Sequence, residues 1–215
     1  MSHEATRKLI LVPAVITLGV TLLRLVGELQ GWSPQLFSKE PGGGGAIVGI
    51  AWLVLVFGAW FGWKLARAGS GPASIGRALG ITLLALALVP ALRFLANLAG
   101  IPRYSPATLP VYLAASIAAV VIGRGAWPAL GRVLFAYGLA ARIPVVLVML
   151  AAILGNWGTH YDVMPPGMPP MDGLAKWFMI GVLPQLTIWM AFTVVIGGLF
   201  GIAAAAIAGR KPATA

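Results

Sequence analysis

Residues 9–29 read LILVPAVITLGVTLLRLVGEL, a stretch whose only charged side chains are Arg24 and Glu28. About twenty apolar residues in a helix cross the ~30 Å hydrocarbon core of a bilayer, so this stretch predicts a transmembrane helix. The whole chain follows the same pattern. Its 215 residues are 60% hydrophobic and 9% charged, and its mean hydropathy is +0.94. Roughly 25% of the residues of soluble domains are charged. The composition therefore excludes a soluble enzyme, a secreted disulfide-bonded domain and a nucleic-acid-binding domain, despite the net charge of +10.

Five further stretches are long enough and apolar enough to cross a bilayer. The expected fold is an all-α polytopic integral membrane protein with six transmembrane helices in three hairpins. We expect one domain over residues 1–215, with spans at about 9–29, 45–65, 78–99, 109–123, 129–157 and 177–209. The last stretch is longer than one crossing requires. Pro184 is expected to divide it, because proline removes a backbone donor and kinks a helix.

Lysine and arginine are unevenly distributed between the expected loops. One side carries Lys39, Arg103 and Lys176, and the other carries Arg7, Lys8, Lys64, Arg67, Arg77, Arg124, Arg132, Arg210 and Lys211. The side with more basic residues faces the cytoplasm in most membrane proteins. This distribution predicts that both termini are cytoplasmic. The short loops and the richness in alanine and glycine favour a cell inner membrane.

A short internal similarity links the first and third expected spans. LRLVGELQG at 23–31 aligns with LRFLANLAG at 92–100. Because both spans run in the same direction, this alignment is consistent with a parallel repeat of a helical hairpin. Chance similarity in a chain rich in leucine, glycine and alanine is the alternative interpretation.

Three arginines lie inside expected spans, where a charge costs ~2.5–3.5 kcal/mol on the insertion scale. Thr17, Thr21, Arg24 and Glu28 recur at helical spacing, so they share one face, which is expected to point into the bundle. A carboxylate, phosphate or lipid head group would suit convergent guanidiniums. The candidate substrate-binding residues are Arg24, Glu28, Arg93, Asn97, Arg142, Asn156, His160 and Asp162. The alternative is structural: arginine side chains can extend to the interface, and Glu28 can neutralise Arg24.

The segment 156–174 is rich in proline and methionine and is expected to form an outer loop between the last two spans. We interpret it as a lid over the outer end of the bundle, with His160 and Asp162 close enough to share a ligand or a proton. Thioethers and an imidazole also suit Cu(I). The weak candidate metal ligands are His160, Met164, Met168 and Met171, although methionines in such a loop often pack on helix ends instead.

The sequence offers little catalytic chemistry. It has no cysteine and two histidines, and it lacks the serine-hydrolase and phosphate-loop motifs. We therefore expect no cofactor, and the chain favours a non-enzyme. One hypothesis is a permease-type or substrate-binding membrane subunit for an anionic small molecule or lipid head group. A second is a non-catalytic accessory subunit that binds the lipid bilayer and other membrane subunits. An intramembrane enzyme that uses Glu28, His160 and Asp162 on a lipid-linked substrate is a third.

Overall fold

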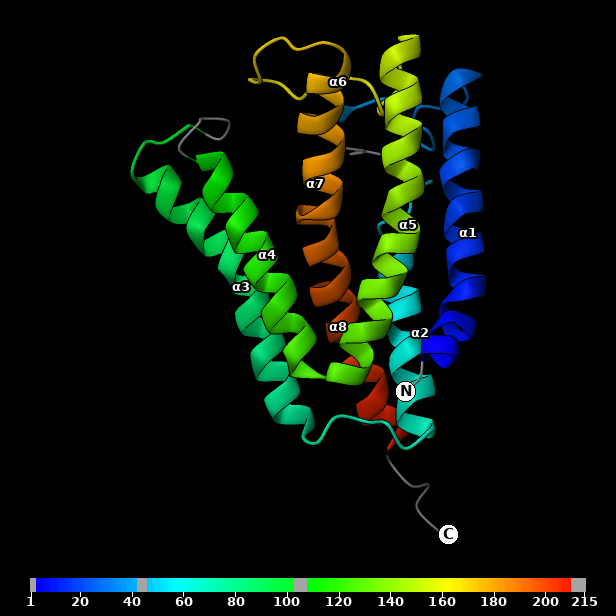
Figure 1. Ribbon diagram of the computed structural model, residues 1–215, viewed down its shortest axis with the longest axis vertical. Coiled ribbons are helices and arrows are strands. Elements are labelled where there is room, and N and C mark those ends of the chain that lie inside the picture. Colours follow the sequence, from blue (N-terminus) through cyan, green and yellow to red (C-terminus); the bar gives the residue numbers. More distant parts are fainter. Residues whose placement is uncertain (1–2, 42–45, 103–107, 210–215) are drawn as a thin grey trace.

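The computed structural model describes residues 3–41, 46–102 and 108–209, and every regular element within them is helical (Figure 1). The expected start of the second span at Gly45 lies outside the described residues. So do Arg103, Arg210 and Lys211 from the charge count. The all-helical class expected from the sequence is confirmed.

Five helical segments are long and apolar enough to cross a membrane. Four are single helices: α1 (His3–Leu29), α3 (Ile75–Leu98), α4 (Thr108–Ala126) and α5 (Pro128–Gly155). The fifth, Gly173–Ala208, combines α6 (Gly173–Lys176), the π-helix η2 (Trp177–Val182), α7 (Leu183–Leu186) and α8 (Ile188–Ala208). The remaining helix, α2 (Leu53–Arg67), has 15 residues. A count of six transmembrane helices therefore stays a prediction.

The helix expected over 45–65 begins only at Leu53, because residues before it bond to an earlier part of the connection between α1 and α2. The amide of Ile47 donates to the carbonyl of Gln35 at 3.2 Å, and that of Val48 donates to Leu36 at 3.0 Å. These amides are therefore not available to an α-helix. Non-helical backbone at membrane depth is tolerated where protein surrounds it. The first part of the expected span is instead a loop, in which Gly49 lies beside the guanidinium of Arg24 on α1.

Helices α1 and α3 end in the same way at aligned positions of the internal similarity. Gly31 and Gly100 adopt left-handed φ angles of 65° and 67°. The amides of the following residues, Trp32 and Ile101, bond back to the carbonyls of Gly27 and Ala96 at 2.8 and 2.9 Å. This is the Schellman ending, which glycine permits because it has no Cβ. The aligned glycines therefore have one structural role, while the repeat itself stays a prediction.

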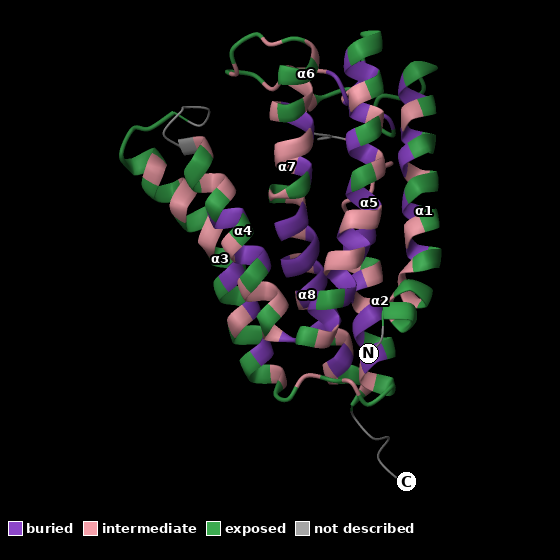
Figure 2. Cartoon of the chain, viewed as in Figure 1, coloured by how far each residue is buried: buried purple, intermediate pink, exposed green. Residues whose placement is uncertain are grey.

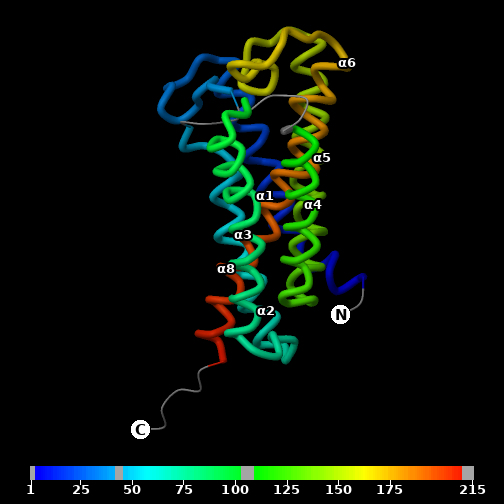
Figure 3. Tube along the Cα trace, turned by 90° about the vertical axis from the view of Figure 1, so that its left-hand side faces the viewer, coloured from blue at the N-terminus to red at the C-terminus, as the bar shows by residue number. Residues whose placement is uncertain are grey.

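The helices α1, α2, α3, α4 and α5 and the segment from α6 to α8 run in alternating directions, and α1 begins at the same end of the bundle where α8 ends (Figure 1). The loops after α1 and after α5 lie together at the opposite end, which we call the loop end (Figure 3). Helix α8 is central and packs against α2, α3, α4 and α5. The α3–α4 hairpin leans away from the other helices toward the loop end (Figure 1).

Burial follows this arrangement, with α5 and α8 most enclosed and the outer faces of α1 and α3 open (Figure 2). Helices α2 and α8 approach closely through glycines. A Cβ on Gly58 would meet the backbone of Gly197, and one on Gly62 would meet that of Gly201. Small residues four apart permit such contacts between membrane helices. The exposed leucines and valines of α1 are suited to contact with lipid.

Candidate functional site

The polar residues of α1 form a buried face, as their spacing predicted. Thr17, Thr21, Arg24 and Glu28 are all buried. The hydroxyl of Thr17 bonds to the phenol of Tyr137 on α5 at 2.8 Å. Because α1 packs mainly on α5, this face is directed into the bundle and away from lipid. The helical spacing predicted this buried face correctly, but it did not predict that Tyr137 would contact it.

Arg24 and Glu28 form the ion pair expected from their separation of one helical turn. Nε of Arg24 donates to Oε1 of Glu28 at 2.8 Å, and the side chains are 7% and 0% exposed. Nη2 of Arg24 also donates to the backbone carbonyl of Ser38 at 2.9 Å. The arginine therefore neutralises a buried carboxylate and holds the loop after α1 against the helix.

His160 reaches the same carboxylate from the loop after α5. Its backbone amide donates to Oε2 of Glu28 at 2.8 Å, and its Nδ1 bonds to Oε1 at 2.5 Å. The neighbouring phenol of Tyr161 donates to the backbone carbonyl of Thr21 at 3.2 Å. We call Arg24, Glu28 and His160 the outer network, where outer means toward the loop end. It joins α1 to both loops at the loop end.

Burial lowers the pKa of His160 below its ordinary value of 6.5. The positive charge of Arg24 lowers this pKa further, while the bond to Glu28 and the carboxylates of Glu28 and Asp162 raise it in part. The imidazole is therefore neutral at pH 7. Its Nδ1–H then donates to Glu28, which leaves Nε2 as a hydrogen-bond acceptor. With a neutral imidazole, the charges of the outer network cancel.

Asp162 and Asn156 have structural contacts in the loop after α5. The carboxylate of Asp162 accepts from the amide and hydroxyl of Thr159, both at 2.7 Å, and from the amide of Gly158 at 2.9 Å. The structure thus brings His160 to Glu28, while Asp162 bonds within its own loop. Asn156 is exposed and ends α5 with a left-handed φ of 49°.

Arg142 on α5 has a different environment, because no acidic side chain pairs with it among the described residues. It is 3% exposed. Its Nη1 donates to Oε1 of Gln185 on α7 at 3.4 Å, and its guanidinium lies 4.9 Å from the ring centroid of Trp189 on α8. Its Nε is buried without a hydrogen-bond partner. Nε2 of Gln185 has the sulfur of Met149 at 4.0 Å, and sulfur is a weak acceptor. We call Arg142, Gln185, Trp189 and Met149 the Arg142 site.

The helix opposite Arg142 is irregular on both sides of Gln185. The π-helix η2 precedes it, and Thr187 follows with φ −123° and ψ −74°. Pro184 lies between them and cannot donate a backbone bond. The indole of Trp177 donates to the carbonyl of Val146 on α5 at 2.9 Å, which fixes the irregular segment against α5. The sequence predicted that Pro184 divides this helix. It did not predict the π-helix or the placement of Gln185 beside Arg142. Turns of π-helix are frequent at functional sites.

Arg93 lies on another part of the bundle. It is half-buried on α3, and α3 packs against α4 and α8. Its Nη1 and the phenol oxygen of Tyr112 on α4 are buried and have no hydrogen-bond partner among the residues that the structure describes. Asn97, one turn further along α3, is exposed. No contact joins Arg93 to Arg24 or Arg142 within the described residues. The structure therefore distributes the three arginines over three environments.

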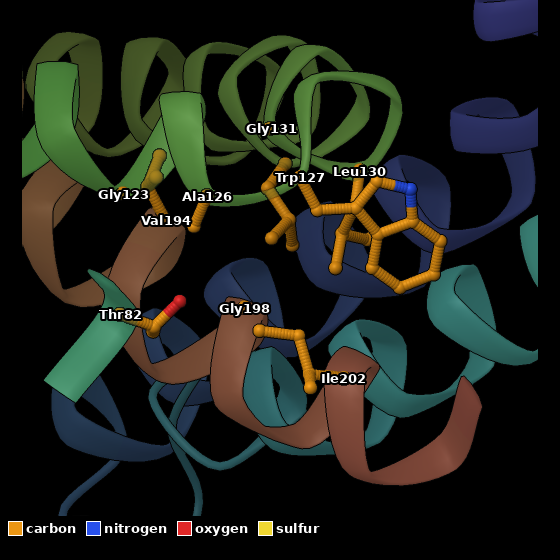
Figure 4. Close-up of a pocket in the computed structure, with 10 residues that line it drawn as sticks. Thr82, Gly123, Ala126, Trp127, Leu130, Gly131, Val194, Gly198 and Ile202 are labelled. Atoms are coloured by element: carbon orange, nitrogen blue, oxygen red, sulfur yellow. The ribbon is translucent and has the colours of Figure 1, made fainter. Parts of the chain in front are cut away.

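A shallow hollow between α3, α4, α5 and α8 lies far along the bundle from the outer network, near the turn from α4 to α5 (Figure 4). Its lining side chains are apolar except for the hydroxyl of Thr82 and the indole N–H of Trp127, which donate to the carbonyls of Ala78 and Ser70 at 2.8 and 2.9 Å. The space does not admit a water molecule. It contains none of the candidate arginines and has no free polar group to bind a ligand.

Two of the three candidate methionines in the loop after α5 pack on apolar side chains. Met164 and Met168 pack on an apolar cluster that includes Val145 and Met149 of α5. Met171 is half-buried further along the loop. The described residues also contain no group of three His, Cys, Asp or Glu side chains that could hold a metal ion. The contacts of Met164 and Met168 favour the packing interpretation of this loop.

Comparisons with protein-family models, with curated proteins and with solved structures found no match. The function of the candidate site is therefore inferred from its geometry alone.

Two acidic residues of α1 provide a matched test of the outer network. Glu28→Gln leaves Arg24 as a buried charge without a carboxylate, which costs about 3–5 kcal/mol of unfolding free energy. Glu4 makes the equivalent pair with Lys8 at 2.7 Å, but both side chains are more than two-thirds exposed. Glu4→Gln should therefore change stability by less than about 1 kcal/mol. Thermal unfolding in detergent measures the stability of both variants. Equal losses of stability would contradict the role given to Glu28.

The lowered pKa of His160 predicts how stability depends on pH. The unfolded chain takes up a proton near pH 6.5 while the folded protein keeps the imidazole neutral. The folded protein should therefore lose stability as the pH falls below 6.5 and regain it above. Tm measured from pH 7.5 to 5.5 tests this expectation, and His160→Gln should show a smaller slope. A wild-type Tm that rises on acidification would mean that the protonated imidazole is the stabilised form.

Proposed function

We propose that this protein is a permease-type or substrate-binding membrane protein that holds an anionic solute or lipid head group at Arg142. One observation carries the proposal: the guanidinium of Arg142 is buried and has no acidic partner in the described part of the chain. The expectation from the sequence was a common cavity for three arginines. The proposal keeps the class of ligand and assigns it to Arg142.

The comparison with Arg24 supports a ligand at Arg142. Both arginines are buried inside the helical bundle. Arg24 has the carboxylate of Glu28 and the carbonyl of Ser38. Arg142 has one long bond to Gln185 and the face of Trp189. An unpaired charge at the bilayer centre costs ~2.5–3.5 kcal/mol even on the insertion scale. An anion from outside the chain would recover part of this cost, and such intramembrane charges commonly mark ligand pathways.

The irregular helix at Gln185 also supports a binding role. A continuous α-helix satisfies its own backbone groups, whereas η2, Pro184 and Thr187 interrupt that pattern beside the buried charge. Interrupted helices are typical of substrate sites near the middle of transporters. The proposal assigns this irregular segment to the ligand site.

The proposal includes a cell inner membrane and cytoplasmic termini. Lys64, Arg67, Arg77, Arg124 and Arg132 lie in or next to the connections at the end where α1 begins. In the described part of the loop end, the lysines and arginines besides Arg24 of α1 and Arg93 of α3 are Lys39, in the loop after α1, and Lys176, at the end of α6. This asymmetry supports a cytoplasmic position for the first end.

A non-catalytic accessory subunit is the second candidate, and the α3–α4 hairpin favours it. The hairpin leans away from the bundle (Figure 1). It also carries Arg93 and Tyr112, whose buried Nη1 and phenol oxygen have no partners. Lipid phosphate or another membrane subunit would provide acceptors there. This candidate assigns no ligand to Arg142.

The two candidates predict different responses to anions and lipids. The purified protein is melted in detergent with a panel of carboxylates, phosphates, halides and anionic phospholipids. A ligand at a hundred times its Kd stabilises the fold by about 2.7 kcal/mol. For the Arg142 site, Arg142→Met abolishes the rise in Tm and Arg93→Met retains it. The reverse pattern, with phospholipid as the active compound, favours the accessory subunit. A panel without any effect contradicts the proposed function.

A further inference from the structure

We propose that the ligand of the Arg142 site is a small, singly charged inorganic anion of the halide class, held between Arg142 and Gln185. This inference rests on the proposed function and narrows its ligand class. It follows from the charge, the hydrogen-bond donors and the burial of the site. Each of these favours a halide over a phosphate, a dicarboxylate or a lipid head group.

The charge of the site fixes the charge of its ligand. Arg142 is the only ionised side chain of the Arg142 site, and arginine stays protonated in proteins. The buried carboxylate of α1, Glu28, is already engaged by Arg24 and His160. One negative charge therefore makes the site neutral. A second charge on the ligand would be desolvated without a partner, which costs several kcal/mol per buried ion.

The available donors suit a spherical anion. Within the described part of the chain, Nε of Arg142 has no acceptor, and Nε2 of Gln185 has only the sulfur of Met149. These N–H groups come from α5 and α7. Nη1 of Arg142 is directed to Oε1 of Gln185, and the ring of Trp189 lies beside the guanidinium. Phosphate binding in proteins usually recruits several cationic or bidentate donors. The described residues offer a single guanidinium here.

The surroundings limit the size and the hydration of the ligand. Arg142, Gln185 and Met149 are each at most 9% exposed. Met190 and Val194 of α8, which follow Trp189 along the same helix, are buried as well. An ion that enters among these buried side chains must lose its water. Large halides lose water more readily than phosphate or sulfate does, because the cost of dehydration rises with charge. A lipid head group would also bring its glycerol and acyl chains into this closed region.

Bromide is the probe for this inference. The wild-type protein is melted over a bromide series, with sulfate added to hold the ionic strength constant. We expect a saturable rise in Tm with bromide. Arg142→Met should lose this rise, and Gln185→Leu should weaken bromide binding about tenfold, because it removes one hydrogen bond to a charged ligand. Arg93→Met is the matched control, since it removes an arginine from another helix, and it should bind bromide as the wild type does.

A second measurement does not depend on any arginine variant being folded. Bromide quenches nearby tryptophan fluorescence, and Trp189 lies 4.9 Å from the guanidinium. A saturable component of quenching should therefore be present in the wild type and absent in Trp189→Phe.

The outcomes separate this inference from the proposed function. If phosphate, a dicarboxylate or phosphatidylglycerol stabilises the protein through Arg142 and bromide does not, the halide inference is wrong and the proposed function stands. A bromide effect that survives in Arg142→Met, or quenching that is unchanged in Trp189→Phe, overturns the inference. If no anion acts on the wild type, both fail.

Discussion

The ion pair between Arg24 and Glu28 is the interaction on which the loop end of this protein depends. A charge inside a bilayer must be neutralised, and these side chains neutralise each other at 2.8 Å within one turn of α1. The pair then organises two distant segments. Arg24 binds the carbonyl of Ser38, and Glu28 accepts both the amide and the imidazole of His160. One buried carboxylate thus joins α1 to both loops.

The need to neutralise a charge inside the bilayer also makes Arg142 important. The surrounding helices enclose it as completely as they enclose Arg24, yet they supply an amide and an aromatic face in place of a carboxylate. The helix that contributes Gln185 is also the one that departs from α-helical geometry. Of the two arginines that are buried in the described part of the bundle, one is therefore paired with a carboxylate and the other is not. The first has a structural role, and the second is the basis of the proposed anion site.

The sequence predicted those features that depend on neighbouring residues. Helical spacing placed Thr17, Thr21, Arg24 and Glu28 on one buried face, and the separation of one turn predicted the ion pair. Features that depend on distant contacts could not be predicted. His160 meets Glu28 across 132 positions of the chain, and Gln185 meets Arg142 across 43. The late start of α2 has the same origin, because Ile47 and Val48 bond to residues 35 and 36. The sequence likewise did not indicate that Arg24, Arg93 and Arg142 would lie in three separate environments.

The difference between the two buried arginines can be measured directly by replacing each with methionine and comparing their unfolding free energies without added ligand. Arg24→Met leaves Glu28 buried beside a neutral imidazole, so we expect a loss of about 3 kcal/mol or more. Arg142→Met replaces an uncompensated charge with an apolar side chain of similar length, so stability should be unchanged or higher. Equal, large losses in both variants would show that Arg142 is already neutralised within the protein and would contradict this account.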